Sequence, residues 1–371
     1  MSKPNMQPDI GSTAPAVLDP PGESVSGIAG EVYRGKGKPW LPPPEGLEWP
    51  RDTGTILDEV GNTPVQVVCL ENGSRIVAKL EWENPTGSSK DRTATMMLTA
   101  ARHLGHLRDE HTILESSSGN TGIALAAFGR ALGHEVMLCV SETVPEGHTR
   151  ILRRLGAKVV LSAGHLGSDG AWQRSLELNA SDPDRYFLPQ QYDNPANPWA
   201  HYLSTGPELW EQCEGTITHF VASVGTGGTV MGTGQYLRER NPDVEIIAVQ
   251  PDEEKHRLFG MRHLGSTKMP GIFRYEGIHD IVEVPTERAY EACRRAWREE
   301  DLLGGASSGA ALEVAHRLAQ EEGGRTVACI LPDSRARYLD TGLCEGYVRV
   351  DGRELTALRV LIERVVQGRQ S

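Results

Sequence analysis

Short apolar runs separated by helical patterns constrain the fold of this chain more than any other feature. The runs lie at 112–115, 135–140, 157–161, 218–223, 244–250 and 326–331. Runs that are apolar on both faces are typical of parallel strands covered by helices on both sides of a sheet. Amphipathic segments at 121–132 and 146–155, each followed by a glycine, predict helices between such strands. The alternation predicts an α/β fold with mostly parallel central sheets covered by helices.

The charge balance narrows the classes of partner. The chain has 371 residues, of which 38 are basic and 50 are acidic, and its formal net charge is −12. A negative field of this kind repels nucleic-acid phosphates and anionic lipids. We therefore expect small-molecule or protein partners, and neither nucleic acid nor a membrane.

The N-terminal region predicts no secretory signal, because residues 1–15 contain no apolar core segment. The uncharged stretch 215–237 is too rich in glycine and threonine for a membrane span. We therefore expect a cytoplasmic protein. Residues 1–50 are rich in proline and predict an extended arm, whose role the sequence does not assign.

The cysteines predict buried free thiols rather than disulfides or a zinc site. They are scattered, without a CxxC pair or a nearby histidine cluster, and most stand inside apolar runs. They are Cys69, Cys139, Cys213, Cys293, Cys329 and Cys344. We expect no metal site.

Lys90 is the first candidate for a catalytic group. It is one of only eight lysines and lies in NPTGSSKDR (84–92), just before a helical pattern at 94–104. The positive end of a helix dipole disfavours an ammonium group and favours the free amine that a Schiff base needs. A solvated lysine in a first helical turn is the alternative.

Three further segments each join a strand to a helix and offer groups for a ligand. ESSSGNTG (115–122) has hydroxyl, amide and backbone N–H groups suited to a carboxylate, and VGTGGTVMG (224–232) has glycines that let backbone amides approach a phosphate. LLGGASSGAALEVA (302–315) places serine hydroxyls, which carry no formal charge, before a helix. The alternatives are a capped helix, a tight turn and an N-cap serine.

An amine, a carboxylate loop, a phosphate loop and a neutral serine together describe a pyridoxal 5′-phosphate enzyme that acts on an amino acid. Residues 56–347 resemble the cysteine synthase and cystathionine β-synthase family, which are fold-type II enzymes of this cofactor. The motifs that carry the resemblance are GNTP (61–64), NPTGSSKDR (84–92), ESSSGNTGIALA (115–126), QQYDNPANP (190–198), STGPELW (204–210), VGTGGT (224–229), GASSGAA (305–311) and LPDSRARYLDT (331–341).

The resemblance implies a role for each matching position. Lys90 would form the Schiff base with the cofactor and later transfer the α-proton of the substrate. Asn120 would hydrogen-bond the 3′-oxygen of the cofactor, and Ser307 would face its pyridine nitrogen. The residues implied for the cofactor phosphate are Gly225, Thr226, Gly227, Gly228 and Thr229. The residues implied for the substrate carboxylate are Ser117, Ser118, Gly119, Asn120, Thr121 and Gln191.

The same resemblance implies the reaction, a β-replacement on an activated L-serine through an α-aminoacrylate intermediate. A sulfur nucleophile would give L-cysteine. The leaving group, acetate or phosphate, stays open: Arg262 resembles the arginine that meets the phosphate in O-phosphoserine sulfhydrylases, and a surface arginine is the alternative. Homocysteine, cyanide or an amine as nucleophile, a serine or threonine dehydratase, and a scaffold without turnover are the other functions considered. A homodimer is the family's usual assembly, and a sulfur-carrier protein is a further expected partner.

The resemblance also implies two domains with the active site in the cleft between them. We expect a larger, phosphate-binding domain from 51–85 and 200–350. A smaller, mobile domain at 86–199 would carry the carboxylate loop. A C-terminal helix or tail is expected at 351–371.

Overall fold

The computed structural model describes residues 42–339 and 341–345. The predicted C-terminal helix or tail at 351–371 lies outside the described residues, as does most of the predicted N-terminal arm. Within the described part of the chain, no helix is long and apolar enough to cross a membrane.

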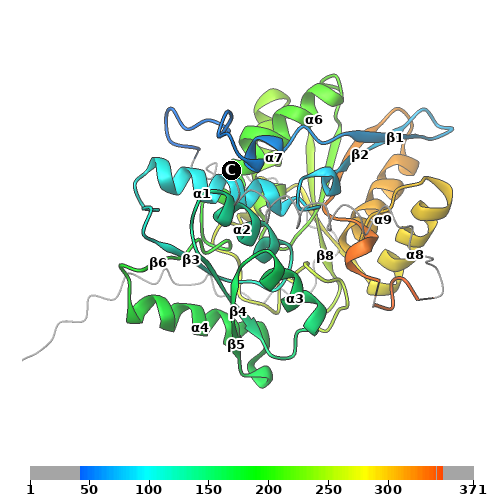
Figure 1. The fold of residues 1–371 in the computed structure, drawn as a ribbon. Helices are drawn as coiled ribbons and strands as arrows, with labels where there is room; N and C mark the ends of the chain where they lie inside the picture. Colours follow the sequence, from blue (N-terminus) through cyan, green and yellow to red (C-terminus); the bar gives the residue numbers. More distant parts are fainter. Residues whose placement is uncertain (1–41, 340, 346–371) are drawn as a thin grey trace, which may run out of the picture. The chain divides into compact units, whose positions relative to one another are not determined.

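The strands form two sheets (Figure 1). The six-stranded sheet has the order β1 (Val65–Cys69), β2 (Arg75–Leu80), β10 (Thr326–Leu331), β7 (His219–Ser223), β8 (Glu245–Pro251) and β9 (Asp280–Val284). The four-stranded sheet has the order β5 (Lys158–Ser162), β4 (Val136–Ser141), β3 (Thr112–Ser116) and β6 (Tyr186–Phe187). Every pairing is parallel except that of β1 with β2. The α/β class with mostly parallel sheets is confirmed.

Helices connect the strands and cover the sheets (Figure 1). The α-helices are α1 (Lys90–His103), α2 (Asn120–Ala131), α3 (Glu146–Arg154), α4 (Gly167–Ser181), α5 (Ala196–Ala200), α6 (Gly206–Gln212), α7 (Gly228–Arg240), α8 (Thr286–Glu299) and α9 (Ala306–Glu321). The short 3-10 helices are η1 (Ile56–Glu59), η2 (Glu81–Glu83), η3 (Gly164–Leu166), η5 (Tyr275–Gly277) and η6 (Arg335–Arg337). One short π-helix, η4 (His201–Thr205), follows α5.

The predicted strands and helices agree with the structure to within one or two residues. All six apolar runs are strands, and the segments expected at 121–132 and 146–155 are α2 and α3. Most of these runs are apolar because helices cover both faces of the sheet around them, whereas the run in the edge strand β5 is partly exposed. The interior of β10 shows this, since each of its residues is buried.

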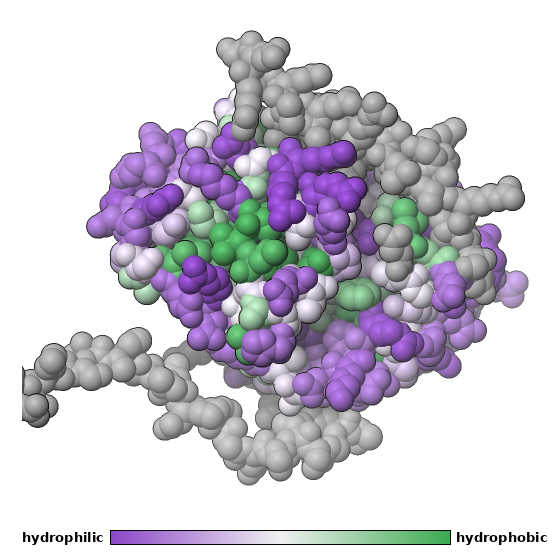
Figure 2. All heavy atoms as spheres, turned by 60° about the horizontal axis from the view of Figure 1, so that its bottom comes forward, coloured by the Kyte–Doolittle hydropathy of each residue, from purple (hydrophilic) through white to green (hydrophobic). Residues whose placement is uncertain are grey.

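The edges of the sheets are where solvent reaches the strands. β5 is the outer strand of the four-stranded sheet, and its Leu161 is 51% exposed. Figure 2 brings the side of β5 and α4 forward and shows an apolar area among hydrophilic side chains. Cys69, on the outer strand β1, is also exposed, so the expectation that the cysteines are buried is wrong for this one; the other five are buried.

Three of the four segments singled out in the sequence leave the carboxyl ends of parallel strands. The fourth, 302–315, joins α8 to α9, so the expectation that it follows a strand is wrong. The segment after β2 leads to α1, the one after β3 to α2, and the one after β7 to α7. Parallel strands of one sheet end at the same edge, and this edge is where α/β folds bind ligands. The residue bounds of the two domains stay a prediction; Leu57 and Val60, placed in the larger one, pack in the core of the four-stranded sheet.

Candidate active site

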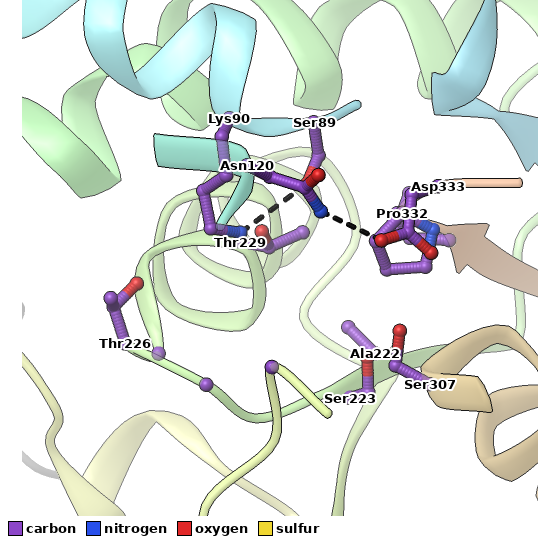
Figure 3. Close-up of a pocket in the computed structure, with 14 residues that line it drawn as sticks. Ser89, Lys90, Asn120, Ala222, Ser223, Thr226, Thr229, Ser307, Pro332 and Asp333 are labelled. Atoms are coloured by element: carbon purple, nitrogen blue, oxygen red, sulfur yellow. Dashed lines mark hydrogen bonds between the residues drawn. The ribbon is translucent and has the colours of Figure 1, made fainter. Parts of the chain in front are cut away.

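A pocket forms where these strand ends meet (Figure 3). Its walls come from segments that connect the strands of both sheets. The space between these walls, including the part that is open to solvent, is about 470 Å³. The lining residues that the sequence predicted are Lys90, Asn120, Gly225, Thr226, Gly227, Thr229 and Ser307. The lining residues that it did not predict are Ser89, Ala222, Ser223, Gly260, Ile330, Pro332 and Asp333. The structure therefore gathers the predicted cofactor residues around one space, with Gly228 just behind the lining.

Lys90 is the first residue of α1, as the sequence predicted. Its Nζ points into the pocket, 3.4 Å from the hydroxyl oxygen of Ser89 (Figure 3). Burial lowers the pKa of the Lys90 ammonium group, and the nearby Asp333 carboxylate opposes this shift. Desolvation thus favours the free, nucleophilic amine. The sequence argument had relied on the helix dipole, whereas here burial is the main cause.

The glycine loop after β7 needs its glycines for space. Gly227 has φ of +87°, a left-handed backbone that other residues rarely adopt, and a Cβ there would stand 2.8 Å from Cδ2 of Phe273. A Cβ on Gly225 would overlap the carbonyl oxygen of Gly260. A Cβ on Gly228, the first residue of α7, would overlap Oδ1 of Asn197. The loop is therefore a close backbone cradle at a helix N-terminus, the arrangement that binds phosphate.

Neutral side chains support this cradle. Nδ2 of Asn197 donates to the hydroxyl of Thr226 at 2.9 Å, and Thr229 lies 3.2 Å from Nε2 of His201. Burial lowers the pKa of His201 to about 3, so its imidazole is uncharged at neutral pH. His201 was not singled out in the sequence, where no motif marks it. Its place beneath the cradle arises from the π-helix after α5.

The carboxylate loop after β3 is tied to the QQYDNPANP segment. The hydroxyl of Thr121 donates to Oε1 of Gln191 at 2.7 Å, and the backbone N–H of Gly122 donates to the hydroxyl of Ser117 at 3.1 Å. Ser118 is half-buried and Gly119 is exposed. Of the residues predicted to bind a substrate carboxylate, only Asn120 is among the lining residues of the Lys90 pocket. Ser117, Ser118, Gly119 and Thr121 are its neighbours in the chain, and Gln191 lies in the QQYDNPANP segment.

Glu115 connects the loop after β3 to the QQYDNPANP segment. Its carboxylate accepts hydrogen bonds from the backbone N–H of Ser116 at 2.9 Å and of Gln191 at 3.3 Å. Burial raises the pKa of Glu115 to about 7. Glu115 is the first residue of the ESSSGNTG motif, and the motif alone predicts no role for it.

Ser307 lies in the first turn of α9 and lines the pocket (Figure 3). The N-cap of this helix is Gly305, so the alternative of Ser307 or Ser308 as the capping residue is wrong. The hydroxyl of Ser308 instead donates to the backbone oxygen of Asp333 at 3.4 Å. The Ser307 hydroxyl is therefore available to the pocket without a capping duty.

Asp333, directly after β10, is a pocket residue that sequence reasoning missed. It is 2% exposed, and its Oδ2 accepts a hydrogen bond from Nδ2 of Asn120 at 2.7 Å. The signal that could have found it is an acidic residue at the carboxyl end of a fully apolar strand, the same position that marks the other site loops.

Arg262 lies outside this lining but close to it. Its backbone N–H donates to the oxygen of Val224, and Gly260, two residues earlier, forms part of the pocket wall. The guanidinium stands 4.2 Å from the ring centre of Tyr192, beside Gln191. Arg262 is half-buried, and its Nη1 donates to the backbone oxygen of Lys268 at 3.5 Å.

Comparison with known proteins gives the class of enzyme. The chain belongs to the pyridoxal-phosphate dependent enzyme family, whose model matches residues 56–333. The cysteine synthase of Aquifex aeolicus is 42% identical over 299 residues, which cover 78% of this chain and 91% of that protein.

Solved structures agree. O-acetylserine sulfhydrylase isoform 3 from Entamoeba histolytica is 31% identical with a TM-score of 0.76, covering 85% of this chain and 98% of that one. The O-acetylserine dependent cystathionine β-synthase from Helicobacter pylori is 34% identical with a TM-score of 0.73, covering 79% of this chain and 98% of that one. The chain is thus a pyridoxal 5′-phosphate enzyme similar to the cysteine synthases.

The residues present fit this cofactor. The glycine loop packs so closely against Gly260, Phe273 and Asn197 that it has no room for a Cβ, it stands at the N-terminus of α7, and the side chains that support it are neutral. An aldehyde reacts with an uncharged amine, and the lowered pKa of the half-buried Lys90 favours that form. Asn120 and Ser307 add one amide and one hydroxyl to the same space.

Proposed function

We propose that this protein makes L-cysteine by β-replacement on an activated L-serine. The observation that carries the proposal is the single pocket that joins the Lys90 amine to a phosphate cradle, an amide and a neutral hydroxyl. The similarity to cysteine synthases over most of the chain supports the same reaction.

Lys90 holds the cofactor through its amine and moves one proton. When bound, the cofactor supplies a conjugated ring that accepts the electron pair released at the α-carbon of an amino acid. Nζ of Lys90 takes the proton from that carbon, a task for which a pKa lowered by burial is suited. The same nitrogen returns a proton at the end of the reaction.

The remaining pocket residues orient the cofactor. The cradle from Gly225 to Thr229 holds the phosphate, Asn120 donates to the 3′-oxygen of the cofactor, and Ser307 faces the pyridine nitrogen. A hydroxyl brings no charge to that nitrogen, whereas a carboxylate would keep it protonated. A neutral partner favours prompt loss of the β-substituent over prolonged storage of charge in the ring.

The carboxylate of the amino acid binds the loop from Ser117 to Thr121. The N-terminus of α2 favours an anion there. The hydrogen bond from Thr121 to Gln191 brings the second segment to the same place. We propose that this loop excludes water as it closes on the substrate, which limits hydrolytic loss.

Arg262 favours O-phospho-L-serine as the donor. A guanidinium matches the geometry of phosphate, and this one is held beside the pocket by Tyr192 and by the backbone bond to Val224. We expect Arg262→Ala to lower kcat/KM for O-phospho-L-serine by about tenfold to a hundredfold and to change that for O-acetyl-L-serine by less than threefold. Steady-state rates with both donors check this, and an equal loss for both would remove the donor assignment.

The function itself is tested with the purified full chain and pyridoxal 5′-phosphate. Each donor is supplied with sulfide, and L-cysteine is measured. We expect cysteine from at least one donor, and none above background from Lys90→Ala. Release of pyruvate without cysteine would identify a dehydratase instead. Homocysteine is offered in parallel, because one structural relative is a cystathionine β-synthase.

Assembly and location complete the proposal. We expect a homodimer in the cytoplasm, with a sulfur-carrier protein as a source of the nucleophile. Sedimentation velocity tests the dimer. Assays in which a carrier-protein thiocarboxylate replaces free sulfide test the role of the sulfur-carrier protein.

A further inference from the structure

The Asp333 carboxylate is placed to act on the cofactor pocket through another side chain. Its two oxygens accept hydrogen bonds from the hydroxyl of Tyr338, at 3.1 and 2.9 Å, and Oδ2 also accepts from Nδ2 of Asn120 at 2.7 Å (Figure 3). No role has been given to it above. The donors come from two directions, since Asn120 begins α2 and Tyr338 follows η6.

The surroundings of Asp333 fix the carboxylate in place. It is 2% exposed, and a buried carboxylate is costly unless its oxygens are hydrogen-bonded. Burial raises the pKa of Asp333, while Asn120 and Tyr338 lower it. A Cβ on Gly305 would overlap both Asp333 and the Tyr338 ring, so these groups are packed without spare room. The carboxylate therefore has one arrangement.

This arrangement decides how the Asn120 amide faces the pocket. A carboxylate only accepts hydrogen bonds, so the nitrogen end of the amide must turn towards Asp333. An amide nitrogen carries two hydrogens, and the bond to Asp333 uses one of them. The second remains for a ligand. Without Asp333, nothing in this contact would distinguish the oxygen end from the nitrogen end.

We propose that Asp333 is a positioning residue that orients the Asn120 amide so that the second hydrogen of this amide is donated to the 3′-oxygen of the cofactor. The inference rests on the role proposed for Asn120. Asp333 also acts on the pKa of Lys90, so the proposal predicts that most, rather than all, of the effect of Asp333→Ala on the bound cofactor disappears when Asn120 is absent. Cofactor binding can be measured without any amino-acid substrate, so a failure of this inference is distinct from a failure of the proposed reaction.

The test is a double-mutant cycle on the full chain. The dissociation constant of pyridoxal 5′-phosphate and the absorption maximum of the bound cofactor are measured for wild type, Asp333→Ala, Asn120→Ala and the double variant. We expect Asp333→Ala to weaken cofactor binding by about tenfold and to shift the absorption maximum. In the Asn120→Ala background, we expect the same substitution to change binding by less than about twofold.

Two milder variants guard against a purely structural effect. In Asp333→Asn, the new amide oxygen can still accept from Asn120, so binding and absorption stay close to wild type. In Tyr338→Phe, only the second donor is lost, and a smaller shift in the same direction is expected, again absent without Asn120. Equal effects of Asp333→Ala in both backgrounds, or an unchanged absorption maximum, would overturn the proposal; if Asp333→Ala does not fold, Tyr338→Phe decides by the same criterion.

Discussion

At the scale of single residues, His201 shows how burial makes a titratable group useful by keeping it uncharged. Its ring lies between the hydroxyls of Thr205 and Thr229, beneath the phosphate cradle. Burial lowers the pKa of His201 from 6.5 to about 3. A neutral ring can exchange hydrogen bonds with both hydroxyls and leaves the phosphate to the backbone amides.

This pKa predicts a loss of stability in acid. The unfolded chain binds a proton at this histidine below pH 6.5, whereas the folded chain does so only near pH 3. Below pH 6.5 only the unfolded chain takes up this proton, so the stability that the folded chain has above pH 6.5 is lost as the pH falls. We expect the free energy of unfolding of wild type, relative to His201→Gln, to decrease by about 2 kcal/mol from about pH 7.5 to about pH 5.

Urea unfolding of the two proteins without cofactor, at both pH values, checks the prediction. The matched control is His148→Gln, since His148 is exposed on α3. A difference between wild type and His201→Gln that stays constant with pH would show that the buried histidine is not the cause.

Most of the cofactor residues were predictable from sequence because they stand in motifs at strand-to-helix junctions, whereas Ser307 follows the connection from α8 to α9. Lys90, Asn120 and the glycine loop are examples, and all line one pocket. Asp333 and His201 were not predictable in this way. Their roles depend on which side chains lie next to them, and these neighbours are distant in sequence: Asn120 is 213 residues from Asp333. A single sequence does not encode such distances in any local pattern.

At the scale of elements, the start of α7 shows why a glycine is needed at Gly228. A Cβ there would overlap Oδ1 of Asn197, whose Nδ2 donates to Thr226 and to the backbone of Gln191. Displacing Asn197 would therefore disturb the phosphate cradle and the carboxylate segment together. We expect Gly228→Ala to lower stability by about 1–3 kcal/mol and to weaken cofactor binding by at least about tenfold.

Gly147→Ala is the matched control for this substitution. Gly147 is also in the first turn of a helix, α3, but a Cβ there meets nothing within 4 Å. Alanine is the better helix former, so this variant keeps its cofactor affinity and gains up to about 1 kcal/mol. Cofactor titration and urea unfolding of both variants check the pair, and normal cofactor affinity in Gly228→Ala would contradict the steric argument.

Three of the strands missed in the sequence, β6, β9 and β1, share a physical reason. β6 has two residues, Tyr186–Phe187, too few to show any alternation. β9 and β1 are the outer strands of the six-stranded sheet, and their burial is mixed because solvent reaches one side. Strands at the centre of a parallel sheet are apolar throughout, so their sequences stand out, while outer and very short strands depend on their neighbours for pairing.

At the scale of the whole body of residues 42–345 that the structure describes, buried charges connect segments of both sheets. The side chain of Arg92, on α1, is fully buried and lies 2.7 Å from Glu81, after β2, and 2.6 Å from Glu208, on α6. Lys79 of β2 contacts Glu208 at 2.9 Å. Burial alone would raise the pKa of Glu81, but the adjacent Arg92 charge lowers it to about 2, so the pair stays ionised. The helix that carries Lys90 is thus joined to the six-stranded sheet by charge.

Removing Arg92 should therefore cost far more than removing an exposed arginine of the same helix. Arg92→Ala leaves Glu81 and Glu208 without their main partner in a buried site, and we expect a loss of about 3–5 kcal/mol in the free energy of unfolding. Arg102→Ala removes a contact with the exposed Asp109, and we expect a change within about 0.5 kcal/mol. Urea unfolding of both variants at neutral pH measures the difference. Because Lys90 is two residues from Arg92, cofactor absorption should weaken in the first variant and remain in the second; similar stabilities of the two would mean that the buried charges do not hold α1 to the sheet.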